Sequence, residues 1–479
     1  MSIKASLGWT AASQIFGSLI QFASSVVLAR TLLPEEVGVF AVGAATTGIL
    51  TIIQQLGLPA LIIRSESVSR DLEATAFTVN LAFSLIVAVG IAVAGSLATT
   101  IFNDSRVEQV MYWLALCPLA LSVSFLPAAQ LERAGDFKTI AIAATISSIA
   151  VALSTLGFLS LGMRYMSLAY AQVIGSLVTS AVLIWSGRRF STIAIGIKEW
   201  RHIAAFSSRI VLIGGSYTLS QRIAEMSLAR LTSIAALGLY NRASSINVLI
   251  WGNVHYVVGR VFLVDFARLY REKQDLSSRY KDTAASLIAL MWPAYFGVAL
   301  LSRQILSVIY GDRWIGASTT LSLLCIGSAI STSLSLSGEL FMATGNVAAQ
   351  ARLEVKRAIF STLLFVLGAF ISLEAAAATR IIDSVVGVLI YGSYVKSMTG
   401  LTSTTFFRLY KTGSILTLLA LTPSALALAF TPAMLQHIPG LAAVIVAGIL
   451  LWVLGLHFSA HPLLRPLHRM IETRRSRTA

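Results

Sequence analysis

Long apolar stretches without charged side chains dominate the chain. Ten of them, each 16 to 27 residues long, contain no Asp, Glu, Lys or Arg: residues 7–29, 37–58, 75–101, 109–130, 139–161, 166–186, 284–302, 358–373, 412–432 and 438–460. Four further stretches have the same apolar character but contain one or more charges: residues 210–231, 237–259, 316–343 and 377–395. Because a helix needs about 20 residues to cross about 30 Å of hydrocarbon, the pattern predicts about fourteen transmembrane helices.

The apolar stretches do not alternate with polar residues as the roughly ten-residue strands of a membrane β-barrel do. The predicted fold is therefore an all-α, polytopic membrane protein. The first stretch is longer than the apolar region of a secretory signal and contains Gln14 and Gln21. We therefore expect it to be retained as a membrane helix.

Composition agrees with a membrane protein, since 56% of the 479 residues are hydrophobic and only 12% are charged. The net charge of +15 would suggest nucleic acid in a soluble protein. Here, 27 of the 36 Lys and Arg residues fall in alternate loops on one side of the predicted spans. This distribution follows the positive-inside rule and predicts that both termini are cytoplasmic, with no nucleic-acid partner.

Catalytic and metal-binding motifs are absent from the sequence. Cys117 and Cys325 lie inside predicted spans, without the spacing of a zinc site, so neither a metal nor a disulfide is expected. The external loops are short and contain no paired carboxylates, His cluster or Gly-rich phosphate loop. A membrane glycosyltransferase or polysaccharide polymerase is therefore disfavoured, and a transporter is favoured.

A weak internal repeat relates the two halves of the chain. Five pairs of segments match in order: Leu28-Ala29-Arg30 with Leu228-Ala229-Arg230, Gly38-Val39-Phe40 with Gly238-Leu239-Tyr240, Ile101-Phe102-Asn103-Asp104 with Ile309-Tyr310-Gly311-Asp312, Leu116-Cys117 with Leu324-Cys325, and Ala134-Gly135-Asp136 with Thr344-Gly345-Asn346. Chance similarity of apolar segments is the alternative, but the ordered series favours duplication. Six crossings per half would give two like-oriented lobes with a substrate site between them. The predicted parts are an N-lobe with a cytoplasmic linker (1–200), a C-lobe (201–411), two further helices (412–462) and a basic cytoplasmic tail (463–479).

Several segments resemble those of a known transporter family. They are LARTLLPEEVGVFAV (28–42), QQLGLPALIIR (54–64), LGLYNRASSI (237–246), YGDRW (310–314) and ATGNVAAQARLEVKR (343–357). On these residues the chain resembles the Wzx-type oligosaccharide flippases, in the polysaccharide transporter family of the MOP superfamily. The resemblance implies two six-helix lobes and transfer of undecaprenyl-diphosphate-linked oligosaccharide units across the inner membrane, for exopolysaccharide, capsule or O-antigen. Leu33 stands where the family commonly has Gly before the Pro34-Glu35-Glu36 turn.

Polar residues recur on single faces of predicted helices. Gln14 and Gln21 lie on one stripe of the first helix, and Gln221 lies beside Thr218 on the seventh. Such stripes could line a hydrophilic cavity for the glycan and diphosphate, or they could join helices by hydrogen bonds. Both interpretations stay open.

Charged residues inside spans are sharper evidence, because each costs about 2.5–3.5 kcal/mol at the bilayer centre. Arg222 and Glu225 lie three residues apart on the seventh helix. We expect Arg222 to bind the diphosphate, since Arg suits forked phosphate contacts. Glu225 would hold Arg222 in the empty site or accept H⁺ or Na⁺. A self-satisfied intrahelical pair is the alternative.

Three other arginines, Arg30, Arg230 and Arg242, lie near the external ends of predicted helices one, seven and eight. They could contact the substrate in the cavity, or they could extend their guanidinium groups to the membrane surface.

The second half holds the other ionisable candidates. Arg380 and Asp383 are predicted to form an ion pair at a helix end, and Asp383 and Glu339 are candidates for coupling to H⁺ or Na⁺. His255 could relay protons or be a packed histidine. No other cofactor is expected.

Two other transport functions stay open. A multidrug or cation antiporter of the related multidrug-extrusion family would be expected to carry acidic residues in the first lobe, whose six predicted spans hold none. A peptidoglycan lipid-precursor flippase is a nearer alternative. The expected partners are the undecaprenyl-diphosphate-linked oligosaccharide and membrane lipids, with a polysaccharide polymerase and a chain-length regulator as candidate protein partners.

Overall fold

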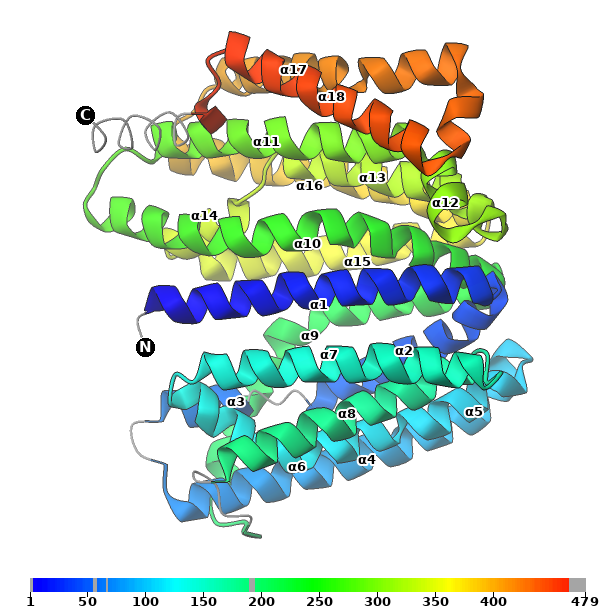
Figure 1. The fold of residues 1–479 in the computed structure, drawn as a ribbon. Helices are drawn as coiled ribbons and strands as arrows, with labels where there is room; N and C mark the ends of the chain where they lie inside the picture. Colours follow the sequence, from blue (N-terminus) through cyan, green and yellow to red (C-terminus); the bar gives the residue numbers. More distant parts are fainter. Residues whose placement is uncertain (1–2, 55–57, 66–67, 189–193, 465–479) are drawn as a thin grey trace, which may run out of the picture. The chain divides into compact units, whose positions relative to one another are not determined.

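The computed structural model describes residues 3–54, 58–65, 68–188 and 194–464 of the chain (Figure 1). The regular secondary structure in these ranges is helical, which confirms the predicted all-α fold. Contacts divide the chain into two compact units, Met1–Asn241 and Arg242–Ala479. The division falls inside one long helix, α10, whereas the repeat places the boundary between lobes near residue 200. The lobes therefore stay a prediction.

The helices of the first unit are α1 (Ile3–Thr31), α2 (Pro34–Gln54), α3 (Leu58–Arg64), α4 (Arg70–Phe102), α5 (Ser105–Leu114), α6 (Leu116–Arg133), α7 (Phe137–Ser160), α8 (Met166–Gly187), α9 (Trp200–Leu231) and the start of α10 (Ile234–Arg271). The second unit continues with α11 (Leu276–Leu300), α12 (Ser302–Tyr310), a 3₁₀ turn (Asp312–Ala317), α13 (Ser318–Thr332), α14 (Ser337–Ala343), α15 (Val347–Ala369), α16 (Leu373–Thr399), α17 (Ser403–Phe430), a 3₁₀ turn (Pro432–Gln436), α18 (Ile438–Phe458) and a final 3₁₀ turn (Pro462–Leu464).

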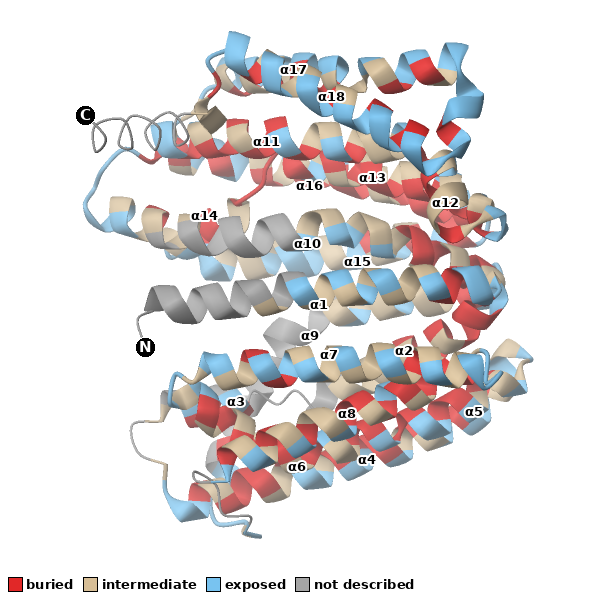
Figure 2. Ribbon diagram, viewed as in Figure 1, coloured by how far each residue is buried: buried red, intermediate tan, exposed pale blue. Residues whose placement is uncertain are grey.

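Each predicted span coincides with one helix or with consecutive helices. Among the described residues, eight helical segments are long and apolar enough to cross a membrane: 70–102, 105–133, 137–160, 166–187, 276–300, 312–343, 403–430 and 438–458. Large apolar side chains such as Leu85, Val89 and Leu97 are exposed on α4, and α17 and α18 also present exposed apolar residues (Figure 2). Outward apolar faces are expected where lipid is the solvent. The count of fourteen spans stays a prediction.

Two helices extend into segments that the charge pattern assigns to loops. α10 continues to Arg271 and α15 begins at Val347. In α10 the side chain of Arg268 pairs with Asp265 one turn earlier, at 2.9 Å. Charged residues on a single helix face are compatible with a helix that leaves the hydrocarbon, so charge marks the membrane boundary better than the helix boundary.

The packing of each unit follows the apolar faces of its helices. In the first unit, α7 packs against α1 and α8, α6 packs against α4 and α8, and α2 packs against α9. In the second unit, α13 packs against α11 and α16, α15 packs against α16, and α17 packs against α11 and α18. The last two long helices, α17 and α18, thus form part of the packing of the second unit.

The Pro34-Glu35-Glu36 turn at the start of α2 is held by carboxylate contacts. Glu36 accepts a hydrogen bond from the backbone N–H of Leu33 at 2.9 Å and one from Nη2 of Arg164 at 2.8 Å. Leu33 is not among the described residues with positive φ, so this turn does not require the glycine found in the family. The turn geometry is therefore intact in this chain.

The carboxylate of Glu35 contacts Arg106, which also pairs with Asp104 at 2.7 Å. Asp104 caps α5 by accepting from the backbone N–H of Arg106 at 2.9 Å. Burial alone would raise the pKa of Asp104, but the hydrogen bonds from Arg106 lower that pKa below its usual value. The Pro34-Glu35-Glu36 turn thus connects the start of α2 to the start of α5 through ion pairs.

The matched segments of the repeat occupy equivalent places in the structure. Residues 28–30 end α1 as residues 228–230 end α9, and α2 begins at Pro34 as α10 begins at Ile234. Gly135 and Gly345 both have left-handed backbone conformations, with φ of 71° and 76°. These agreements favour duplication over chance similarity.

The equivalent glycines Gly38 and Gly238 meet in a reciprocal helix crossing. A Cβ atom on Gly38 would lie 2.0 Å from the carbonyl oxygen of Ile234, and one on Gly238 would lie 1.9 Å from that of Pro34. The contact between Pro34 and Gly238 is therefore the counterpart of the contact between Ile234 and Gly38. Such reciprocal contacts are the pattern of a local twofold axis. Glycine at both positions lets the backbones of α2 and α10 touch.

We expect Gly38→Ala and Gly238→Ala each to lower the yield of folded protein, because the new methyl group meets backbone atoms that cannot rotate away. Overpacking of this kind costs about 1–3 kcal/mol. The measurement is the monodisperse fraction in fluorescence-detected gel filtration. Gly252→Ala is the matched control on α10, since nothing described lies within 4 Å of its Cβ position. Equal yields for Gly238→Ala and Gly252→Ala would contradict the tight crossing.

The predicted span 316–343 is not one continuous helix, which corrects the sequence analysis. α13 ends at Thr332, α14 begins at Ser337, and Leu336 between them has a φ of 68°. Serine is abundant at the break, and the Ser335 hydroxyl donates to the carbonyl oxygen of Thr332 at 2.7 Å. Such local hydrogen bonds compete with the helix, and this competition explains why an apolar run breaks here.

Side chains of neighbouring helices donate to the carbonyl oxygens at the break. The donors are Trp292 Nε1 to Ala329 (2.9 Å), Tyr280 Oη to Ser335 (3.4 Å) and Tyr410 Oη to Ser333 (3.5 Å). Tyr280 and Trp292 belong to α11, and Tyr410 belongs to α17. Within a membrane, a broken helix persists only where neighbours satisfy the released backbone groups, so α11 and α17 stabilise the break.

Candidate substrate site

In the first unit, Arg222 of α9 lies where α9 packs against α2. Arg222 of α9 donates from Nη1 to Oε2 of Glu225 at 2.8 Å, one turn further along the same helix. A Cβ atom on Gly48 of α2 would lie 2.6 Å from Nε of Arg222. The absence of a side chain at Gly48 therefore leaves the space in which the guanidinium lies.

The Arg222–Glu225 pair is only partly shielded. The side chain of Arg222 is 35% exposed and that of Glu225 is 18% exposed. The ion pair uses the Nη1 nitrogen of a group with five N–H donors. The intrahelical pair is thus present, and the same arginine also retains an accessible surface through which an anion could be bound.

The amide side chains of the predicted polar stripes differ in their surroundings. Gln21 on α1 is exposed, and Gln221 on α9 is half-buried. The side chain of Gln14 lies outside the described residues. On α2, Thr51 donates to the carbonyl oxygen of Gly48 at 3.1 Å, so this hydroxyl is directed to its own helix.

The three arginines near helix ends divide into two kinds. Arg30 and Arg230 are exposed at the ends of α1 and α9. Arg242 of α10 is only 7% exposed, and its guanidinium carbon lies 5.0 Å from the ring centroids of both Tyr310 and Trp314. These cation–π contacts stabilise a buried charge and favour an anchoring role for Arg242 over substrate binding.

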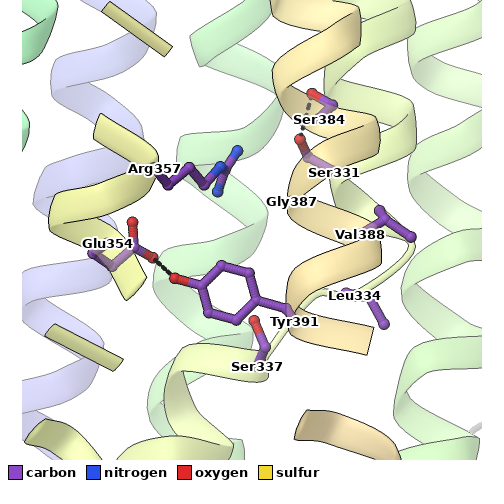
Figure 3. A pocket seen from close by; sticks show the side chains of 9 residues that line it. All are labelled: Ser331, Leu334, Ser337, Glu354, Arg357, Ser384, Gly387, Val388 and Tyr391. Atoms are coloured by element: carbon purple, nitrogen blue, oxygen red, sulfur yellow. Dashed lines mark hydrogen bonds between the residues drawn. The ribbon is translucent and has the colours of Figure 1, made fainter. Parts of the chain in front are cut away.

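The second unit has a polar pocket at the break between α13 and α14 (Figure 3). Its volume is about 70 Å³, enough for a few water molecules. The lining residues are Ser331, Leu334, Ser337, Glu354, Arg357, Ser384, Gly387, Val388 and Tyr391. They come from α13, α14, α15, α16 and the turn at the break. Broken helices that line polar cavities are typical of substrate and ion sites in transporters.

Charged groups from α15 and α16 define one side of this pocket. Arg357 donates from Nε and Nη2 to the two carboxylate oxygens of Asp383, at 3.1 and 3.0 Å. The hydroxyl of Tyr391 donates to Glu354 at 2.7 Å. A Cβ atom on Gly387 would lie 3.1 Å from the guanidinium carbon of Arg357, so this glycine lets the arginine pack on α16.

The predicted ion pair between Arg380 and Asp383 is wrong. Asp383 pairs with Arg357 of the neighbouring helix, while Arg380 donates to the hydroxyl of Ser361 at 3.0 Å and lies over the ring of Phe365 at 4.6 Å. The bidentate geometry of Arg357 and Asp383 explains this choice of partner. Sequence spacing favoured the nearest arginine on the same helix, and only the packing of α15 on α16 reveals the other.

Two ion-coupling candidates of the second half remain, Glu339 and His255. Glu339 is buried in the first turn of α14, directly after the break. The side chain of His255 lies outside the described residues.

Glu354, Arg357 and Tyr391 are the site residues that the sequence analysis missed. Glu354 and Arg357 fall in the basic segment before the predicted span 358–373, which the charge pattern assigned to a cytoplasmic loop. Their i, i+3 spacing before an apolar run is the signal that could have placed them on one helix face.

Comparisons with known proteins give matches over most of the chain. Residues 27–319 match the model of a family described as "Polysaccharide biosynthesis protein". The lipopolysaccharide biosynthesis protein WzxC of Escherichia coli (strain K12) is 21% identical over 381 residues, which are 77% of this chain and 75% of WzxC. The succinoglycan biosynthesis transport protein ExoT of Rhizobium meliloti (strain 1021) is 23% identical over 339 residues, which are 69% of this chain and 67% of ExoT.

Solved structures of transporters have a similar fold. The lipid II flippase MurJ, in an inward closed conformation, superposes with a TM-score of 0.76 over 95% of this chain and 99% of MurJ, at 14% identity. An inward-facing multidrug resistance transporter of the MATE family, in the MOP superfamily, gives a TM-score of 0.58 over 81% of this chain and 96% of its own, at 15% identity. At such identities the likeness concerns the fold, which is that of MurJ and MATE.

Proposed function

Because the chain belongs to the polysaccharide biosynthesis protein family, as a multi-pass membrane transport protein of the Wzx type, we propose that it transfers an undecaprenyl-diphosphate-linked oligosaccharide unit across the cell inner membrane. The transfer supplies exopolysaccharide, capsule or O-antigen synthesis and proceeds by alternating access. The chain crosses the membrane fourteen times, with both termini in the cytoplasm. The protein partners are a polysaccharide polymerase and a chain-length regulator.

The observation that carries this proposal is the placement of Arg222 against Gly48 of α2 and Glu225 of α9, which we call the seat of Arg222. An anionic diphosphate needs a cation inside the membrane, and a desolvated arginine is expensive unless a partner compensates its charge. Glu225 compensates Arg222 while the site is empty, and the guanidinium stays partly accessible. When substrate enters, the diphosphate replaces Glu225 as the acceptor, in a forked geometry that arginine favours.

Other polar residues of the first unit complete the proposed binding surface around Arg222. Gln21 and Gln221 offer amide groups to the glycan, and the exposed Arg30 and Arg230 attract the diphosphate at the ends of α1 and α9. The second unit, taken by itself, offers hydroxyl groups and Glu354 to sugar hydroxyls at its pocket at the helix break. For ion coupling we propose Glu225 and Glu339, because both oxygens of Asp383 already accept from Arg357.

The experiment that tests this function uses a strain that lacks the gene. We expect loss of surface polysaccharide and accumulation of the lipid-linked unit in the cytoplasmic leaflet, both restored by the wild-type gene. Unchanged polysaccharide together with increased sensitivity to cationic drugs would contradict the proposal and favour a multidrug antiporter. Restoration of growth in a strain depleted of its lipid II flippase would instead favour a peptidoglycan-precursor substrate.

The seat of Arg222 also predicts the effect of a single methyl group. We expect Gly48→Ala to fold normally, because the flexible Arg222 side chain can move aside, and to reduce polysaccharide export by roughly 10-fold because the guanidinium leaves its position. A tenfold loss corresponds to about 1.4 kcal/mol. Gly157→Ala, with nothing described within 4 Å of its Cβ position, is the control. Wild-type export by Gly48→Ala would contradict the importance of the seat.

A further inference from the structure

The short segment that precedes α9 is fixed to the first turns of α4. Its contacts are Gly196 N–H to Thr78 Oγ1 (3.0 Å), Glu199 N–H to Thr75 Oγ1 (3.2 Å) and Lys198 Nζ to Asp71 (3.1 Å). The three acceptors on α4 lie four and three residues apart, so they share one face of that helix. The segment is therefore held along α4 although it has no regular secondary structure.

Close packing reinforces this attachment. A Cβ atom on Gly196 would lie 3.0 Å from Cβ of Ala74, so the backbone of the segment rests directly on α4. Ile203, in the first turn of α9, is buried in a cluster that includes Leu72 and Ala76 of α4. The position of the segment is thus determined at its middle and at its end.

Fixing the backbone turns two large apolar side chains outward. Gly196 faces α4, and its neighbours Ile195 and Ile197 are 82% and 68% exposed. Two isoleucines held rigidly in water lose the hydrophobic contribution that burial would provide. Their exposure side by side on a fixed segment is therefore typical of a site that an apolar surface covers.

Two Trp–Arg pairs flank the isoleucines in the sequence. Arg188 lies 4.5 Å from the ring of Trp185 at the end of α8, and Arg201 lies 5.7 Å from the ring of Trp200 at the start of α9. Both indole rings are exposed. Tryptophan is enriched at the boundary between hydrocarbon and headgroups, and basic residues there attract anionic phospholipids.

The sequence of α4 changes from charged to apolar residues close to where the segment contacts this helix. This helix begins with the charged residues Arg70, Asp71 and Glu73 and then continues as an apolar membrane span. The segment contacts α4 where the charged turn gives way to the apolar helix. The isoleucines therefore lie beside the first turns of the apolar part of α4.

We propose that this surface binds anionic phospholipid headgroups of the bilayer. We call it the interfacial strap, and it consists of Trp185, Arg188, Ile195, Ile197, Trp200 and Arg201. Ile195 and Ile197 insert into the upper acyl region, and Arg188 and Arg201 bind the lipid phosphates. The strap anchors the beginning of α9, the helix that carries Arg222, at the membrane surface. This inference does not depend on which substrate the protein transports.

Site-directed spin labelling of the full chain in lipid nanodiscs tests the strap. Nitroxides are placed at Ile195, Ile197 or the exposed control Lys273, after replacement of Cys117 and Cys325 by alanine. In discs of phosphatidylcholine with phosphatidylglycerol, we expect positions 195 and 197 to be more accessible to oxygen than to a water-soluble nickel chelate. Position 273 should show the opposite order. If the nickel chelate reached positions 195 and 197 as readily as position 273, the two isoleucines would not be in lipid and the proposal would be overturned. A protein partner would then be the favoured explanation of their exposure.

Native mass spectrometry of the unlabelled protein tests the headgroup contact without new cysteines. We expect Arg188→Gln combined with Arg201→Gln to reduce the number of retained phosphatidylglycerol molecules, while Arg303→Gln, at an exposed site outside the strap, leaves it unchanged. Phosphatidylglycerol retention that is the same in the double variant and the wild type would overturn the electrostatic part of the proposal.

Discussion

Arg222→Ala is expected to reduce delivery of the lipid-linked unit to the outer leaflet by roughly 10- to 100-fold while the protein level stays normal. The loss follows from removal of a charge-assisted hydrogen bond to the diphosphate, worth about 1.5–3 kcal/mol. Folding should survive because the remaining carboxylate, Glu225, is not fully buried: its side chain is 18% exposed. Surface polysaccharide and membrane protein level, measured in the same cells, check this expectation.

Two variants separate binding from simple charge balance. Arg222→Lys keeps the charge but loses the forked geometry, so we expect it to restore export only in part. Arg303→Ala, which removes an exposed arginine of the second unit, should export normally. Full export by Arg222→Ala would remove this arginine from the substrate site.

Arg357→Ala is expected to destabilise the second unit strongly. Both carboxylate oxygens of Asp383 accept from Arg357, so the substitution leaves a buried carboxylate without its partner. Breaking a fully buried pair in this way costs about 3–5 kcal/mol. Asp383 is buried but the side chain of Arg357 is 26% exposed, so we expect a loss of about 3 kcal/mol, still a large part of a typical stability of about 5–15 kcal/mol. A fall in the monodisperse fraction and in the melting temperature of the purified protein would be the result.

The double variant Arg357→Met with Asp383→Leu distinguishes a structural role of this pair from a role in transport. Apolar replacement of both partners often restores stability. If the pocket at the helix break contacts the glycan, the double variant should be stable but deficient in export. If the double variant is stable and exports normally, the Arg357–Asp383 pair serves packing alone. If the single variant Arg357→Ala has normal stability, the ion pair itself is contradicted.

Helix positions were largely predictable from the sequence because the constraint behind them is simple. Backbone groups in lipid must be bonded within a helix, so the described residues of each charge-free run of sufficient length lie mainly in one helix or in two consecutive helices. The break at Leu336 was not predictable, since its apolar run is as long as the others. It depends on serine hydroxyls and on donors from α11 and α17, which are remote in sequence.

The candidate site was predictable only where its residues share a helix. Arg222 and Glu225 were found from their spacing, but the seat at Gly48 needed the packing of α2 against α9. Asp383 was assigned to the wrong arginine for the same reason. The spacing of Arg242 in the sequence also did not predict its contacts with the rings of Tyr310 and Trp314. Contacts between helices decide these cases, and a single sequence does not contain them.

Translocation by the purified protein tests the central claim most directly. The protein is reconstituted in liposomes with a fluorescent undecaprenyl-diphosphate-linked oligosaccharide in both leaflets, and an impermeant glycosidase is added outside. In the time that the wild-type protein needs for cleavage of nearly all the lipid-linked oligosaccharide, we predict cleavage of little more than the outer half with the Arg222→Ala variant and of only the outer half without protein. Cleavage that stops at half with correctly folded wild-type protein would contradict transfer of this substrate.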